Sequence, residues 1–307
     1  HSGFICSQSA SEINCSRDLL LANSRVTGNA TESNNAEGGG VRVSFADLVT
    51  NGSIISGNTT RGMGASGGGI SAEPSHLRLT DTIVSGNETQ GANANGGGLI
   101  SGSGIFNQIT MLRSQVIDNS TSAADTDGGG LWVSLADFSF LRMTDSTVSG
   151  NAATRRGGGL YNQQTRLGST ITRSTFSGNT ANDGGGIFDT SGYLSIVNST
   201  LSGNSAAQGA GLCATAASDV TLNHVSVVNN SSSGAGITGS VAGGINQDGG
   251  NMVINNSLVV NNAGGDCSIN GGTITGMTSI DSDTSCDTIA PTALSTSSPF
   301  DIDNLAF

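Results

Sequence analysis

Residues Gly67–Asn87 read GGGISAEPSHLRLTDTIVSGN, and this stretch contains the pattern that decides the fold. A run of glycines is followed at once by an apolar residue, Ile70, and the stretch closes on Ser-Gly-Asn at Asn87. Between these markers, Leu77 and Leu79 alternate with polar neighbours. An apolar period of two indicates a β-strand, not an α-helix.

The same pattern recurs along the chain at intervals of 25 to 32 residues. The closing asparagines are Asn29, Asn58, Asn87, Asn119, Asn151, Asn179, Asn204, Asn230 and Asn262. The glycine runs end at Gly40, Gly69, Gly98, Gly130, Gly159, Gly186, Gly211 and Gly244. From the last glycine of a run to the next asparagine the distance is 18 to 21 residues, whereas the return distance varies from 7 to 14. A constant wall and one variable corner are typical of a solenoid.

Each wall carries apolar residues at matching positions. The residues after the glycine runs are Val41, Ile70, Leu99, Leu131, Leu160, Ile187, Leu212 and Ile245. Three residues before the asparagines stand Val26, Ile55, Val84, Val116, Val148, Phe176, Leu201, Val227 and Val259. Positions ten and eight before the asparagine are mostly apolar too, with Ser169 and Thr50 as exceptions. The chain is therefore predicted to be all-β, a single right-handed parallel β-helix of about nine coils with three short strands per coil.

Other folds agree less well with this pattern. The apolar positions do not recur at 3.6 residues, and the glycines would interrupt any helix. An antiparallel sandwich is the remaining alternative, but it would not need so constant a repeat. Stacked columns of like side chains would give a chain with only 35% hydrophobic residues an apolar interior. Asparagine at the turn tolerates left-handed backbone and can form hydrogen-bonded ladders between coils.

The charge of the chain excludes two classes of partner. The net charge is −12, all 11 basic residues are arginine, and the last of them is Arg173. Nucleic acids and anionic membranes require clustered positive charge, so neither is expected as a partner. The sequence also lacks an apolar run of about 20 residues, so direct membrane insertion is not expected.

Five cysteines indicate an oxidising compartment. Cys6 with Cys15, and Cys267 with Cys286, lie near opposite ends and could each form a local disulfide that staples a terminal segment. We therefore expect an N-terminal segment over residues 1–18, coils over residues 19–262 and a C-terminal segment over residues 263–307. Cys213 remains, and its position suits a free thiol or an intermolecular bond equally.

The strings GGGI, LRLTDTIVSGN, SIVNSTLSGN and NNAGGDCS resemble those of a large family. These are the secreted bacterial right-handed β-helix repeat proteins, which share repeats with polymorphic outer-membrane proteins and autotransporter-like passengers. The resemblance covers about Asn29 to Cys286. It implies a secreted or cell-surface protein but no particular activity, because this fold hosts lyases, hydrolases, adhesins and stalks alike.

Catalytic and metal-binding patterns are weak. Asp125 and Asp127, with Asp137 and Asp183 farther along, could act as the acid and base of a glycoside hydrolase, but a solvated loop explains the pair as well. The histidines His1, His76 and His224 fall in separate coils. The acidic string Asp281-Ser282-Asp283 with Asp287 suggests Ca²⁺, although the full binding-loop pattern is missing. We assign no catalytic residue, metal site or cofactor.

One column of the repeat is rich in aromatic residues. Two residues after the last glycine of each run stand Arg42, Ser71, Ile100, Trp132, Tyr161, Phe188, Cys213 and Asn246. Strand alternation places this column outside, so Ile100, Trp132, Tyr161 and Phe188 are predicted to stack on consecutive coils as an exposed stripe. Such a stripe would bind sugar rings or a partner. Alternatively, a variable corner of the same chain covers it.

Two functions follow from these observations. The first is a non-catalytic structural or adhesive β-helix at the cell surface, either a rod or a subunit that stacks end to end into a filament. Its partners would be other copies of the chain, or a cell-surface or glycan ligand. The second is a carbohydrate-active β-helix enzyme, a polysaccharide lyase or hydrolase. The lack of a catalytic constellation and of an evident cap favours the first.

Overall fold

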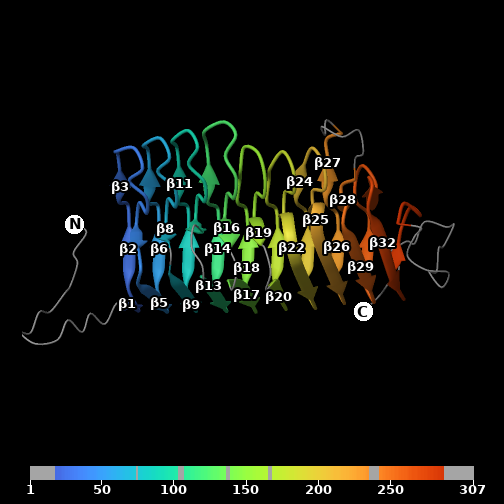
Figure 1. The fold of residues 1–307 in the computed structure, drawn as a ribbon, viewed down its shortest axis with the longest axis horizontal. Coiled ribbons are helices and arrows are strands. Elements are labelled where there is room, and N and C mark those ends of the chain that lie inside the picture. The colour runs from blue at the N-terminus through green and yellow to red at the C-terminus, as the bar shows by residue number, and fades with distance from the viewer. Residues whose placement is uncertain are drawn as a thin grey trace, which may run out of the picture.

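The computed structural model describes residues 18–73, 75–102, 107–135, 139–164, 168–234 and 242–286. Every regular element in these ranges is a β-strand, and all pairings between strands are parallel. The strands coil into a right-handed parallel β-helix, so the predicted fold is confirmed. Figure 1 shows the coils side by side along the long axis of a rod.

One repeat illustrates the coil. The stretch that opens with Gly67 forms β8 (Ile70–Ala72), β9 (His76–Thr80) and β10 (Ile83–Ser85), which are the three predicted strands of the wall. A fourth strand of two residues, β11 (Glu88–Thr89), follows in the corner. The corner strand was not predicted, because its outline is set by backbone pairing between coils and not by apolar side chains.

The strands stack into four sheets. The two strands that follow each glycine run share one sheet of 17 strands. It contains β1 (Asp18–Ala22), β4 (Val41–Val43), β5 (Asp47–Asn51), β8, β9, β12 (Leu99–Ser101), β13 (Gln108–Leu112), β16 (Leu131–Leu135), β17 (Phe140–Thr144), β19 (Leu160–Gln164), β20 (Ser169–Thr172), β22 (Ile187–Val197), β25 (Leu212–Asn223), β28 (Ile245–Asp248), β29 (Asn251–Asn255), β31 (Cys267–Ile269) and β32 (Thr273–Met277). In β22 and β25 the two strands of a coil have merged into one of 11 or 12 residues.

The third strand of each coil belongs to a separate sheet of ten strands. They are β2 (Arg25–Thr27), β6 (Ile54–Ser56), β10, β14 (Gln115–Ile117), β18 (Thr147–Ser149), β21 (Thr175–Ser177), β23 (Thr200–Ser202), β26 (Ser226–Val228), β30 (Leu258–Val260) and β33 (Ile280–Asp281). Ten strands stack in this sheet, one more than the nine closing asparagines, because β33 follows the last of them. The corner strands are β3 (Ala30–Thr31), β7 (Thr59–Thr60), β11, β15 (Ser120–Thr121), β24 (Ser205–Ala206) and β27 (Ser231–Ser232).

The interior consists of stacked apolar columns. Leu48, Leu77, Ile109 and Leu141 follow one another in register and are at most 1% exposed. Where the pattern has a polar residue, the interior supplies it with a partner. Thr50 is buried and shares a hydrogen bond of 2.9 Å with the hydroxyl of Thr82. The core columns predicted from the repeat are thus confirmed, including their polar exceptions.

The closing asparagines form a buried ladder along the corner. In each step the Oδ1 of one asparagine accepts bonds from the backbone N–H and the Nδ2 of its neighbour one coil earlier, as Asn151 does from Asn119 at 3.0 Å each. The ladder runs unbroken through the nine closing asparagines from Asn29 to Asn262. The expected side-chain ladder is therefore present and links every coil to the next.

The coils continue beyond the predicted boundary at residue 262. Strands β31, β32 and β33 add to the same sheets, so the β-helix extends at least to Asp281. The sequence predicts the last coil to end at Asn262, because the marker Ser-Gly-Asn does not occur again after it. At the other end, β1 begins at Asp18, next to the predicted boundary. Cys6 and Cys15 lie outside the described residues.

Candidate functional site

The predicted aromatic column is stacked as expected. Trp132 and Tyr161 have ring centroids 5.9 Å apart and an interplanar angle of 5°. Tyr161 and Phe188 follow at 5.8 Å and 10°. Ile100 precedes Trp132 in register and Cys213 follows Phe188. The side chains from Ile100 to Cys213 therefore form one continuous stack, with one residue from each of β12, β16, β19, β22 and β25, on the outer side of these strands.

The predicted exposure of this column is wrong. Ile100 is 5% exposed, Tyr161 8% and Phe188 3%, while Trp132 is half-buried. The glycine runs explain the burial, because the corner bends back over the column. A Cβ added to Gly67 would lie 2.7 Å from Ile100 Cγ2, so only a residue without a side chain can come so close. The alternative, that a corner of the same chain covers the column, is the one observed.

Two charged side chains, Arg156 and Asp183, also lie at the outer side of the aromatic column. The guanidinium of Arg156 lies 4.9 Å from the centroid of the Phe188 ring. Arg156 also faces the buried carboxylate of Asp183 at 3.7 Å. Burial raises the pKa of Asp183 and of the Tyr161 hydroxyl above their usual values. Arg156 and Asp183 thus pack at the outer side of the column, next to the buried rings of Tyr161 and Phe188.

The carboxylates proposed as a catalytic pair, Asp125 and Asp127, have different surroundings. Asp127 is 2% exposed and accepts two hydrogen bonds from Arg155, the first at 2.8 Å from Nε. Asp125 is exposed and has a left-handed backbone with φ of 58°. The two carboxylates thus have different partners and environments, and Asp137 lies outside the described residues. A buried ion pair with arginine is a structural use of Asp127.

The histidines and the remaining thiol also have structural positions. His76 Nδ1 lies 3.1 Å from the carboxylate of Asp47 on the neighbouring coil, and His224 is exposed at a corner with φ of 55°. His1 lies outside the described residues. Cys213 is 1% exposed, and burial raises the pKa of its thiol to about 12. It lies in the expected outward column but is covered there, so it cannot form an intermolecular disulfide without local unfolding, and of the two alternatives the free thiol is the one observed. Among the described residues, no three His, Cys, Asp or Glu side chains gather to hold a metal ion.

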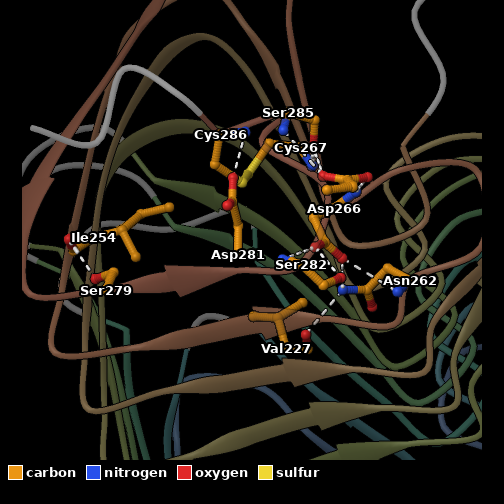
Figure 2. Close-up of a disulfide and its surroundings, with 11 residues drawn as sticks. Val227, Ile254, Asn262, Asp266, Cys267, Ser279, Asp281, Ser282, Ser285 and Cys286 are labelled. Carbon is orange, nitrogen blue, oxygen red and sulfur yellow. Dashed lines mark hydrogen bonds between the residues drawn. A yellow bond between two sulfur atoms is a disulfide. The ribbon is translucent and has the colours of Figure 1, made fainter. Parts of the chain in front are cut away.

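A disulfide-stapled cap closes the C-terminal end of the rod (Figure 2). Cys267 and Cys286 are joined, as the sequence predicted. Asp266 takes the place of the next asparagine in the ladder, since its Oδ1 accepts the Nδ2 of Asn262 at 2.8 Å. Its Oδ2 accepts the backbone N–H and the hydroxyl of Ser282, both at 2.7 Å. The ladder therefore ends on a carboxylate that the following turn satisfies.

The acidic residues Asp281 and Asp283 of this turn also accept hydrogen bonds at the end of the β-helix. Asp283 accepts the backbone N–H of Asp266 at 3.0 Å, and Asp281 accepts that of Cys286 at 2.8 Å. Ser285 accepts the N–H of Cys267 at 2.8 Å. These bonds use N–H groups that a further coil would otherwise pair. The carboxylates that suggested Ca²⁺ thus act as hydrogen-bond acceptors for the end of the β-helix, and Asp287 lies outside the described residues.

An open groove lies elsewhere, on the outer face of the 17-stranded sheet. It has a volume of about 410 Å³ and follows β20, the second half of β22 and of β25, and β29. Tyr193 stands in it with 60% of its surface exposed. The outward row Thr170, Ser195, Thr221 and Val253 forms its floor, one residue per coil.

The described residues at the groove edge carry polar groups and no cation. Asp219 and Asn251 follow Tyr193 in register, and Asn251 Nδ2 donates to Asp219 Oδ1 at 3.0 Å. On the other side Gly168 precedes Tyr193 in register. An added Cβ on Gly168 would lie 3.1 Å from Tyr193 Cβ, so the glycine leaves that flank of the tyrosine open. The result is one exposed aromatic ring between hydroxyl, amide and carboxylate groups.

Sequence reasoning missed this groove although a signal was present. Tyr193 precedes Leu194, one of the inward residues ten before the asparagine, so alternation places it outward. In the part of the chain that the structure describes, glycines of the runs lie against Ile100, Trp132 and Phe188 and not against Tyr193. The predicted stripe and Tyr193 obey the same alternation, and they differ only in whether a corner covers them.

Within the residues that the structure describes, there is no helical segment with the length and apolarity needed to span a bilayer. Comparison with known protein families, curated proteins and solved structures finds no match for this chain.

Proposed function

We propose that this protein works outside the cytoplasm as a non-catalytic adhesive rod that holds a ligand along the outer face of its 17-stranded sheet. The observation that carries the proposal is the groove around Tyr193, where a largely exposed aromatic ring stands among hydroxyl groups on a rigid wall. The Cys267–Cys286 disulfide supports an oxidising location. The similarity of the repeats to secreted β-helix proteins points the same way.

The capped end favours lateral adhesion over end-to-end stacking. In a filament, the N–H groups of the last coil would pair with the first coil of another copy. Here Asp283 and Ser285 already accept the N–H groups of Asp266 and Cys267. A second copy could not add to this end without displacing the stapled turn. The expected filament is therefore the weaker form of the structural hypothesis.

The groove chemistry also favours binding over hydrolysis. Glycoside hydrolysis uses two carboxyl groups on either side of the scissile bond. Among the residues that line the groove, Asp219 is the sole carboxyl group, and it is hydrogen-bonded to Asn251. A single carboxylate with an amide partner can position a sugar hydroxyl, but it offers no second group to complete acid–base catalysis.

Retention on immobilised polysaccharides tests this function. The purified chain should be retained by at least one member of a panel of neutral, acidic and amino polysaccharides, and it should release no new reducing ends or unsaturated products. Tyr193→Ala should abolish retention. The matched control is His224→Ala, which changes an exposed side chain at a different corner and should leave retention unchanged. Retention by none of the panel, or depolymerisation of any member, would contradict the proposal.

A further inference from the structure

We infer that the groove around Tyr193 binds an extended, uncharged polysaccharide whose chain runs parallel to the axis of the rod. This inference rests on the proposed adhesive function and adds to it the class and orientation of the ligand. Three features carry it: the course of the groove across the coils, the chemistry of its lining, and the absence of positive charge from that lining.

The course of the groove sets the direction of the ligand. Its lining comes from four consecutive coils, with Thr170, Ser195, Thr221 and Val253 at equivalent positions. Neighbouring coils are about 4.8 Å apart, so three steps span roughly 14 Å along the rod. A chain lying along this line meets one outward side chain per coil. The spacing is comparable to the rise of one ring in an extended β-1,4-linked glycan, so about three rings fit.

The lining chemistry matches a sugar chain. A pyranose ring presents axial C–H groups on its faces and hydroxyls at its rim. The exposed ring of Tyr193 offers an apolar face for the C–H groups. Thr170, Ser195 and Thr221 supply hydroxyls that donate and accept, and Asp219 with Asn251 adds an acceptor and an amide. The arrangement places stacking and hydrogen-bonding groups within one groove, as a hydroxyl-rich ligand requires.

The charge of the lining selects against acidic glycans. Among the described residues that line the groove, Asp219 is the one charged side chain and none is basic, and no arginine or lysine occurs after Arg173 in the sequence. The preceding coil places Arg142 next to Thr170 in register, but its guanidinium lies over the ring of Phe140 at 5.0 Å. A polyanion would thus meet one carboxylate and an overall charge of −12. Uncharged chains avoid this repulsion.

Calorimetry with defined oligosaccharides tests the inference. Neutral β-1,4-linked oligomers of two to six hexoses and galacturonate oligomers of the same lengths are titrated into the full chain. Affinity for the neutral series should rise up to about three rings and then level off, and it should not change between low and high salt. Galacturonate oligomers should bind at least about tenfold more weakly at low salt.

Matched variants locate the binding. Tyr193→Ala should weaken neutral binding about tenfold or more, and Tyr193→Phe should retain most of it. Thr221→Val removes one groove hydroxyl and should weaken binding about fivefold. Thr110→Val alters the same outward column two coils before Thr170 and outside the groove, so it should have no effect. Arg142→Ala should leave neutral binding unchanged.

Other outcomes separate this inference from the function on which it rests. Tighter binding of galacturonate, weakened by Arg142→Ala and by salt, would overturn the neutral class while the adhesive function stands. An affinity that does not grow from two rings to three would overturn the axial chain. Neutral binding that survives Tyr193→Ala would place the ligand elsewhere. Failure of every class in the retention panel would instead contradict the adhesive function itself.

Discussion

At the scale of single residues, buried polar side chains hold the coils in register. Asn119 is a representative member of the asparagine ladder. Its Oδ1 accepts hydrogen bonds from the backbone N–H and the Nδ2 of Asn87, and its Nδ2 donates to Asn151 Oδ1 and to the carbonyl of Val84. With a further bond from Nδ2 to the carbonyl of Ile117, five polar contacts are made by one amide that is fully buried. The repeat alone predicted that asparagines would form a ladder. It did not predict that Asp266 would end it, since no repeat marker precedes that residue.

Removing one rung should be costly. Asn119→Ala leaves the backbone N–H of Asn87 buried without its acceptor and removes the other polar contacts of a fully buried amide, so we expect a loss of about 3 kcal/mol in the free energy of unfolding. Asn29→Ala is the control, because Asn29 is the exposed first rung and should cost less than about 1 kcal/mol. Denaturant unfolding of both variants checks this. Equal losses would show that burial of the ladder is not what matters.

Asp189 should give the rod a characteristic pH dependence. Its side chain is fully buried, one carboxyl oxygen accepts from Asn162 and the other has no partner, and burial raises its pKa to about 6. The folded state therefore holds its proton more tightly than the unfolded state, whose pKa is near 3.9. Stability contributed by the protonated group is present below about pH 4 and is lost as the pH rises through 6, by about 3 kcal/mol.

The variant Asp189→Asn tests this sign. It should match the wild type near pH 4 and be more stable near pH 8, because the amide never has to ionise in the interior. Thermal unfolding from pH 4 to pH 8 measures both. Wild-type stability that rises with pH over this range, with no change in the variant, would contradict the assignment.

At the scale of elements, strand alternation predicted which side chains point outward, but not which of them a corner of the chain buries. It correctly placed Tyr161 and Phe188 on the outward sides of their strands. Exposure depends on the corners between asparagine and glycine, whose length varies from 7 to 14 residues and whose path has no periodic signal. The close approach of Gly128 to Trp132 shows how one such corner covers the column. The candidate site thus moved from the covered column to an uncovered part of the same sheet.

The covered column should stabilise the fold and not bind ligand. Tyr161→Ala removes a ring packed between Trp132 and Phe188, so we expect a loss of about 3 kcal/mol in the free energy of unfolding. Binding of neutral oligosaccharides should stay within twofold of the wild type wherever the variant is folded. The opposite pattern, a stable variant with weak binding, would restore the aromatic column as the binding surface.

The C-terminal cap should protect only the coils nearest to it. Replacing Cys267 and Cys286 together by serine removes the staple of the turn that accepts the N–H groups of the last coil. Because each coil contacts only its neighbours, hydrogen exchange should accelerate over β30 to β33 and remain slow around β14 and β18. Cys213→Ala, which leaves the staple intact, should not change exchange in the cap. Uniform acceleration along the rod would argue against a local cap.

At the scale of the whole molecule, the fold was almost fully predictable because every coil repeats the same physical solution. Apolar columns, glycine corners and the asparagine ladder each recur with the repeat, so the sequence carries the signal for them many times. The groove, in contrast, is built from residues that do not recur with the repeat. Its identity depends on Tyr193, Gly168 and Asp219 at positions where other coils have different residues, and a single occurrence offers no pattern from which to detect it.

A crystal structure of the full chain with a neutral β-1,4-linked hexasaccharide tests the central claim most directly. The account predicts about three ordered rings along the rod axis, one stacked on Tyr193 and the others beside Ser195 and Thr221. Sugar bound across the axis, at the Trp132 column or at either end of the rod would contradict it.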